Sequence, residues 1–264
     1  MHVVALQFEK GLADAFATRL AAVLGITLLE ARSRLSEPAG GPSVLAVFPA
    51  AAPAEAYAAE LRSRGFDVFV LPPTAVETDA ARLLVRTFRL GPEGLSAQSR
   101  QGRTAEVAWG DVRLLLRAVR YSQSESRRVE QKRKLSFGRA ILTGGLMVTK
   151  TVRTVHRETT DESDPWLLLY PAAGPPLVFR QGDLNYAGLG RSLQPAVAAN
   201  FQRLIAEVRQ ASPGALWDER LATRPGQARL LGPSLPIETH FDVAVSLLAR
   251  TLLAAPRPDG RLPG

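Results

Sequence analysis

The 264-residue chain contains no cysteine and three histidines, and these shortages exclude several kinds of site. Without cysteine there is no disulfide framework, no thiolate zinc site and no cysteine nucleophile. The histidines, His2, His156 and His240, are scattered and show no metal-ligand spacing. We therefore expect no metal and no other cofactor, and a reducing compartment fits this composition best.

Long apolar runs are also missing. No stretch approaches the roughly 18 apolar residues of a membrane-spanning helix, and the N-terminus MHVVALQFEK lacks the basic start and apolar core of a signal peptide. We therefore expect a cytoplasmic protein. Hydrophobic residues make up 46% and charged residues 22% of the chain, a composition typical of globular proteins, and the length allows two domains.

The net charge of +8 lies almost entirely in one part of the chain. Residues 126–157, here called the basic segment, hold nine basic residues and one acidic residue, whereas the remainder is close to neutral. Such a distribution indicates one basic element on a balanced body, not a nucleic-acid-binding surface spread over the whole protein.

The glycines in and beyond this segment do not match nucleotide-binding loops. A phosphate loop requires glycine, four residues and then Gly-Lys-Ser/Thr, but Gly138 and Gly144 are followed by Gly145 and Leu146. The stretch GLGRSL at 188–193 lacks the third glycine of the dinucleotide fingerprint. No Gly-x-Ser-x-Gly motif supports a hydrolase nucleophile either. We therefore expect no enzyme activity and no small-molecule substrate.

The basic segment predicts an anion-binding surface. Each Lys or Arg beside acidic lipid headgroups contributes about 1 kcal/mol, and Phe137 and Ile141 are available to enter the interface. This favours peripheral contact with the inner face of a membrane. RNA phosphates attract the same segment, but few aromatic residues for base stacking lie nearby. The candidate anion-binding residues are Arg127, Arg128, Lys132, Arg133, Lys134, Arg139 and Lys150.

A simpler interpretation of the same segment has no ligand. Residues 122–135 are then a solvated, mobile loop, and residues 136–155 form a long hairpin that turns at Thr143-Gly144-Gly145. Both interpretations stay open on the sequence alone.

Residues 1–73 predict a small α+β module. Three apolar runs of strand length alternate with helical patterns in the order strand, helix, helix, strand, helix, strand, which lets helices cover one face of a sheet. Thr27 and Glu30 have the spacing of a capping box, and Gly25 and Gly65 can end helices. The predicted strands are 3–8, 43–48, expected to be central, and 67–71.

Two stretches of this module, GITLLEARSRL and VLAVFPAAAPAEAYAAELRSRGFDVFVL, carry a family likeness. The module resembles the C-terminal domain of the bacterial ribosomal stalk protein and the related Clp protease adaptor fold. The resemblance implies a protein-binding or dimerising module and, together with the basic segment, suggests a ribosome- or RNA-associated factor as the alternative function.

After a predicted linker at 72–80, the pattern of residues 80–212 changes to short strands followed by one helix. We expect the helix that Pro195 opens to bury an apolar face against an antiparallel sheet. The predicted strands are 82–90 and 94–100 as a hairpin, two strands within 103–121 around a Trp-Gly-Asp turn, and 165–171 with 175–181 as a second hairpin. The predicted apolar face consists of Val197, Phe201, Leu204, Ile205 and Val208.

The strand pair broken by AWGDVRLL and the single closing helix resemble a bacterial pleckstrin-homology-like or GRAM-like domain. The resemblance implies a small antiparallel β barrel closed by a C-terminal helix. Residues 213–264 form a helical tail, with a helix at 240–255 that packs on one of the domains or on a second chain, and with a disordered end.

The sequence thus predicts an α+β protein in which a stalk-like α/β sandwich precedes a pleckstrin-homology-like barrel. The expected function is non-catalytic: the protein docks a protein partner and contacts an anionic surface through the basic segment.

Overall fold

The structure of the chain is a computed structural model that describes residues 1–9, 14–35, 40–135 and 149–254, with backbone alone over 123–135 and 149–161. The chain divides into two compact units. One unit comprises residues 1–120 and 164–264, and the other comprises residues 121–163.

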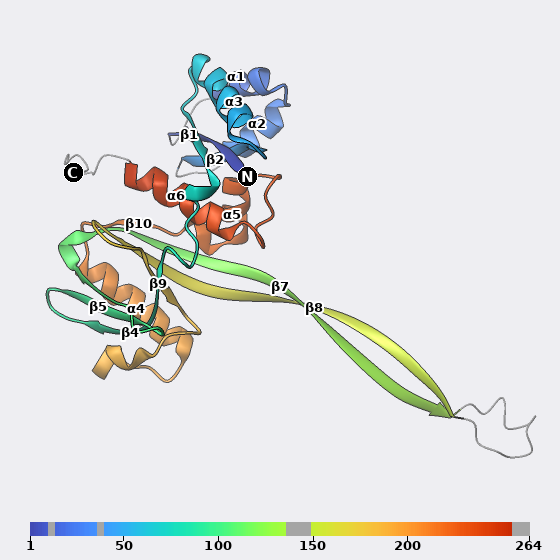
Figure 1. Cartoon of the computed structure of the whole chain (residues 1–264), viewed down its shortest axis with the longest axis vertical. Helices are drawn as coiled ribbons and strands as arrows, with labels where there is room; N and C mark the ends of the chain where they lie inside the picture. The colour runs from blue at the N-terminus through green and yellow to red at the C-terminus, as the bar shows by residue number, and fades with distance from the viewer. Residues whose placement is uncertain (10–13, 36–39, 136–148, 255–264) are drawn as a thin grey trace, which may run out of the picture. The chain divides into compact units, whose positions relative to one another are not determined.

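The N-terminal part forms a three-stranded antiparallel sheet (Figure 1). Strand β1 (His2–Phe8) lies between β2 (Gly41–Phe48) and β3 (Val68–Leu71). The prediction that 43–48 is the central strand is therefore wrong. The apolar run VVAL of β1 explains the order, because a strand with paired neighbours and both faces covered is apolar at every position.

Three helices cover one face of this sheet: α1 (Asp14–Leu24), α2 (Leu28–Arg34) and α3 (Ala51–Ser63) (Figure 1). The predicted capping box of α2 is confirmed. The Thr27 backbone N–H donates to Glu30 Oε2 at 2.8 Å, and the Glu30 backbone N–H donates to Thr27 Oγ1 at 3.2 Å. Gly25 and Gly65 adopt φ values of 64° and 80°, which only glycine takes without strain.

A second sheet has seven strands in the order β10-β7-β8-β9-β4-β5-β6 and curls into a half-barrel. The apolar face of α4 (Val197–Ala211) packs against it, as predicted, although Val197 at its start is exposed. The strands are β4 (Leu83–Leu90), β5 (Gly94–Ser99), β6 (Thr104–Ala108), β7 (Val112–Leu135), β8 (Thr149–Pro171), β9 (Leu177–Arg180) and β10 (Leu216–Asp218).

The predicted hairpins β4–β5 and β8–β9 are confirmed as antiparallel pairs. Two strands also flank the Trp-Gly-Asp turn, which is a short 3-10 helix, but these strands, β6 and β7, are not neighbours in the sheet. The interpretation of 122–135 as a mobile loop is wrong, because β7 continues to Leu135. The predicted turn at Thr143-Gly144-Gly145 lies outside the described residues.

The C-terminal helix α6 (Phe241–Ala254) is central to the fold. Eight of its residues from Phe241 to Ala249 are buried. All of them except Ser246 share one hydrophobic core with Val3 of β1 on one side and Leu114 of β7 and Leu168 of β8 on the other. Helix α5 (Arg224–Leu231), which the sequence analysis missed, joins the same core.

The core around α6 spans two of the predicted domains and the predicted tail. Val76 of the predicted linker packs against it, and Leu71 of β3 belongs to it. The boundaries at residues 73 and 212 stay predictions, and the predicted disordered end, the last nine residues, lies outside the described residues. In the described part of the chain, no helix combines the length and apolar character that crossing a membrane requires.

Candidate functional site

The candidate anion-binding residues fall in two strands and in the stretch between them. Arg127, Arg128, Lys132, Arg133 and Lys134 belong to β7, and Lys150 belongs to β8. Arg139 lies outside the described residues. These six residues all belong to the unit formed by residues 121–163. At their positions the basic segment is strand and not loop.

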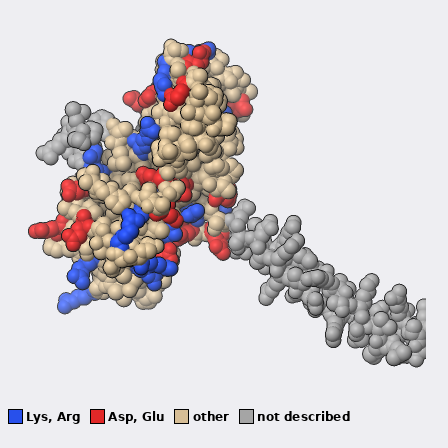
Figure 2. All heavy atoms as spheres, in the orientation of Figure 1, with Lys and Arg blue, Asp and Glu red and all other residues tan. Residues whose placement is uncertain are grey.

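The face shown in Figure 2 carries both signs of charge, with Lys and Arg side chains interspersed among Asp and Glu side chains. The expectation that positive charge outside the basic segment is compensated is consistent with this face.

Strand β6 is an edge of the seven-stranded sheet, with β5 as its one neighbour among the described residues. Two backbone bonds fix which of its groups are paired: Ser99 N–H donates to Arg103 O at 2.8 Å, and Trp109 N–H donates to Glu93 O at 3.1 Å. In an antiparallel ladder, alternate residues carry the bonds. Between these two bonds, the odd-numbered residues of β6 therefore direct their backbone N–H and C=O groups toward β5.

The even-numbered residues of β6 consequently turn their backbone groups away from β5. Thr104, Glu106 and Ala108 present their N–H and C=O groups at the open edge, and all three residues are exposed. Gly91 N–H donates to Gly94 O at 2.8 Å, so the even-numbered residues of β5 direct their backbone groups toward β4. The assignment is thus consistent across three strands.

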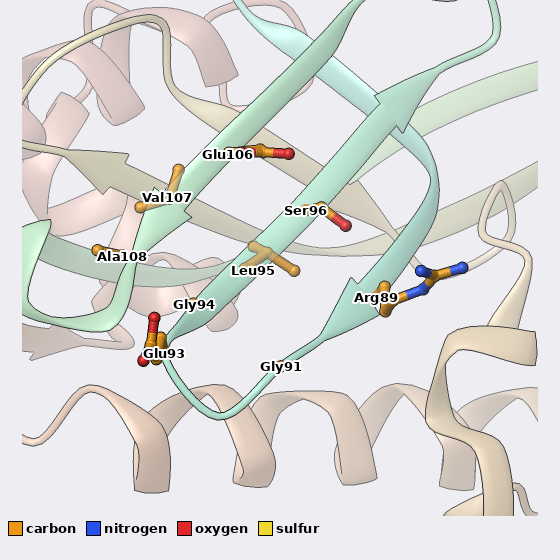
Figure 3. A pocket seen from close by; sticks show the side chains of 9 residues that line it. All are labelled: Arg89, Gly91, Glu93, Gly94, Leu95, Ser96, Glu106, Val107 and Ala108. Atoms are coloured by element: carbon orange, nitrogen blue, oxygen red, sulfur yellow. The ribbon is translucent and has the colours of Figure 1, made fainter.

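A shallow groove, here called the β6 groove, runs over the outer face beside this edge. It consists of two adjoining depressions of about 340 and 410 Å³ that share Arg89, Ser96 and Glu106. These residues form one cross-strand row, since Arg89 pairs with Ser96 and Ser96 pairs with Glu106. Figure 3 shows them coming from β4, β5 and β6 in turn.

Gly94 lines the groove and leaves the strand backbone bare of a side chain at this point. A Cβ atom at Gly94 would lie 2.4 Å from Val107 O, so no other residue fits between β5 and β6 at this point. The charged residues that line the groove are two acids, Glu93 and Glu106, and one base, Arg89. An open backbone edge next to a mildly acidic groove can accept an extended chain that carries a basic residue.

A buried ion network lies apart from this groove, where β4 begins. Arg82 is 1% exposed, and its Nη1 lies 2.5 Å from Asp242 Oδ1 in the first turn of α6. Its Nε lies 3.7 Å from Glu77 Oε2, and the Glu77 backbone N–H donates to Ser246 Oγ at 2.8 Å. The network fastens the predicted linker to α6.

Two groups in or beside the network have shifted acidities. Burial, and then the negative charge of Glu77, hold the pKa of Tyr170 well above its usual value, while Tyr170 Oη donates to Glu77 Oε2 at 2.9 Å. Burial also raises the pKa of Asp164, which accepts a hydrogen bond from Trp166 Nε1 at 2.6 Å. Both groups are satisfied by neighbouring residues, as is common in structural networks.

The described residues contain no cluster of three or more His, Asp or Glu side chains that could hold a metal ion. The sequence analysis missed both the open edge and Arg82. An arginine directly before an apolar strand run, as in ARLLV, is a weak signal for a buried cation, and the free side of a strand depends on pairing that the sequence does not specify.

Comparison with protein-family models, with curated proteins and with solved structures gave no match.

Proposed function

We propose that this chain is a non-catalytic docking protein that captures an extended segment of a protein partner as an additional strand beside β6. The observation that supports this most directly is the row of outward backbone groups on Thr104, Glu106 and Ala108. Sheet edges of this kind bind peptides through main-chain hydrogen bonds, while alternate side chains supply specificity.

The two faces of β6 define the partner segment. On the outer face, Glu106 favours a Lys or Arg opposite it, because opposite charges across a strand pair stabilise the pairing. On the inner face, Val107 is buried and Ala105 is partly buried, so the neighbouring partner positions favour apolar side chains. The expected segment is therefore extended, with a basic residue between two apolar residues.

A second copy of the chain is a poorer occupant of the same edge. Two β6 strands paired antiparallel about their centres would place Glu106 opposite Glu106, and like charges directly opposite are destabilising. Acidic side chains on edge strands commonly prevent such self-pairing. The charge that opposes dimerisation is the one that would select a basic partner.

The test uses the full chain to select binding peptides from a random display library, followed by fluorescence anisotropy on the enriched sequences. Glu106→Pro deletes the outward N–H at this position and leaves the β5–β6 bonds in place, since proline is tolerated on edge strands. We expect at least a tenfold loss of affinity, equivalent to about 1.4 kcal/mol.

Glu106→Ala is the matched control, because it keeps the backbone donor and removes only the carboxylate. We expect a smaller loss, and Glu106→Lys should prefer peptides in which the basic residue is replaced by Glu. Selected peptides that bind Glu106→Pro as tightly as the unchanged protein would refute strand addition at β6.

A second function, contact with an anionic surface, is proposed for the basic segment. It rests on the nine basic residues against one acidic residue in 126–157. A membrane is the preferred surface and RNA the alternative, and a cytoplasmic protein could meet either one. Liposome co-sedimentation and RNA gel shift, each repeated with Lys132, Arg133 and Lys134 neutralised, separate them; failure to bind either would remove this function.

The two family resemblances fit this picture of a binding protein. We propose a stalk-like arrangement for residues 1–73 on the basis of the confirmed order of strands and helices, and a pleckstrin-homology-like arrangement for the half-barrel with α4. Leu29, in the position where the stalk family usually has lysine, is 77% exposed on α2. It offers a partner an apolar contact in place of a charge.

A further inference from the structure

Three arginines surround a small cavity at one end of β4, away from the β6 groove. The cavity has a volume of about 160 Å³, and its lining includes Arg86, Arg100, Arg180 and Asp183. Arg86 belongs to β4, Arg100 follows β5 and Arg180 ends β9. The sheet order brings them together, because β4 lies between β5 and β9.

A bulge in β4 lies at the arginine of that strand. Val85 pairs with Ser99, and Thr87 pairs with Gln98, so Arg86 is one extra residue on the β4 side. Bulges redirect a side chain and recur next to functional sites. On the other side of β4, Val85 pairs in parallel with Phe179, which precedes Arg180.

Asp183 is the one acidic residue among the described residues that line the cavity. Arg100 Nη2 lies 3.0 Å from Asp183 Oδ1, and Arg180 Nη1 lies 3.9 Å from Asp183 Oδ2. Arg86 Nη1 donates to the backbone oxygen of Asp183, which leaves the carboxylate to the other two arginines. The lining thus carries three positive charges and one negative charge.

A further acid, Asp79, reduces this excess from outside the lining. Asp79 Oδ2 lies 2.5 Å from Arg180 Nη2, but Asp79 does not line the cavity, and its other oxygen lies 3.8 Å from Arg82 Nη1. Arg180 also stacks over Trp166 at 4.3 Å, which fixes the guanidinium in place. A positioned arginine loses little conformational entropy when it binds a ligand.

We propose that this cavity binds a phosphate monoester group, an activity that goes beyond the proposed docking at β6. A monoester carries a charge of about −1.5 to −2 at pH 7 and three acceptor oxygens, and the three arginines of the lining offer donors to these oxygens. A carboxylate has a smaller negative charge and only two acceptor oxygens. The volume of the cavity is several times the roughly 30 Å³ that one water occupies, so a phosphoryl group fits.

The test is isothermal titration calorimetry of the full chain with inorganic phosphate, with a short Gly/Ala peptide containing phosphoserine, and with acetate. The free phosphate and the phosphopeptide are the two sources of the same chemistry, and the tighter of them identifies the natural one. Affinity for both should increase as pH is raised from about 5.5 to 7.5, because the second pKa of phosphoserine is about 6 and that of inorganic phosphate is somewhat higher. Acetate should bind at least tenfold more weakly.

Two substitutions have opposite expected effects. Arg100→Ala, at a side chain that is 65% exposed, should weaken phosphate binding about tenfold without affecting the fold. Asp183→Asn removes the competing negative charge and should tighten binding several-fold. A surface that attracts anions without a defined site would not require the arginine at position 100.

Two control variants locate the site. Arg191→Ala changes an exposed arginine elsewhere and should leave phosphate affinity unchanged. Neutralising Lys132, Arg133 and Lys134 together should also leave it unchanged, which separates this cavity from the basic segment. Equal affinity in Arg100→Ala, or acetate binding as tight as phosphate, would overturn the proposal.

Discussion

Arg82 and Asp242, 160 positions apart in the chain, form an ion pair with Arg82 Nη1 2.5 Å from Asp242 Oδ1. The contact joins the start of β4 to the first turn of α6, and thereby the half-barrel sheet to the central helix. Arg82 Nε and Nη2 have no hydrogen-bond partner among the described residues. The buried positive charge is therefore stabilised mainly by the nearby carboxylates of Asp242 and Glu77.

Arg82→Met should therefore destabilise the protein by about 3–5 kcal/mol, because it leaves the carboxylates of Asp242 and Glu77 without their buried cation. Urea denaturation followed by circular dichroism measures the loss. The double variant with Asp242→Asn should lose less than the sum of the two single variants, since the residues interact directly. Additive losses would contradict a coupled pair.

Asp164→Asn should change how stability depends on pH. Because burial raises the pKa of Asp164 above 3.8, its protonated form favours the folded state, and that contribution is lost as pH rises through the folded pKa. Asparagine keeps an acceptor for Trp166 and cannot ionise. As pH rises from roughly 3 to 7, the unfolding free energy of the variant should increase relative to that of the unchanged protein. A difference between the two proteins that stays constant with pH would mean that the carboxyl has an ordinary pKa.

Tyr186→Phe tests a second shifted group at alkaline pH. Burial, and then the negative charge of Asp164, raise the pKa of Tyr186 to about 12 from 10.0. Its hydroxyl donates to Gln181 O at 2.8 Å, so the variant should lose about 1 kcal/mol at neutral pH. That loss should shrink as pH rises from 10.0 toward 12, where the folded tyrosine ionises.

Tyrosinate absorbance gives an independent measurement of the same residue. Subtracting the titration of Tyr186→Phe from that of the unchanged protein should leave one component near pH 12. A component near 10.0 would show that the hydroxyl is not held as described.

Gly188→Ala should destabilise the protein by about 1–3 kcal/mol, as overpacking does in well-packed interiors. A Cβ atom at this position would lie 2.0 Å from Phe88 O, so the backbone of β4 must shift to admit it. Gly182→Ala is the control, since a Cβ there meets nothing within 4 Å. Thermal unfolding of both variants checks the difference, and equal midpoints would mean that the contact with Phe88 is absent.

The glycines of GLGRSL illustrate what the sequence could and could not reveal. Their spacing excluded a dinucleotide fingerprint, and the structure gives their actual reason: Gly188 lies against β4, and Gly190 adopts a φ of 54°. A sequence shows that glycine is present, but the neighbour that requires it lies about 100 residues away.

Local patterns determined most of the elements. The capping box of Thr27 and Glu30, the apolar stripe of α4 and both hairpins were predictable because each depends on residues close together in the chain. Concentration of charge in 126–157 is likewise a property of the sequence alone.

Only the tertiary structure decided that β1 is central, that α6 is shared by two sheets, and that β6 is paired on one side alone among the described residues. Each of these depends on which distant segments pair, and pairing is set by how several apolar faces are buried together. For the same reason, Arg86, Arg100 and Arg180 were three unremarked arginines in the sequence and became one cavity lining when β4 was placed between β5 and β9.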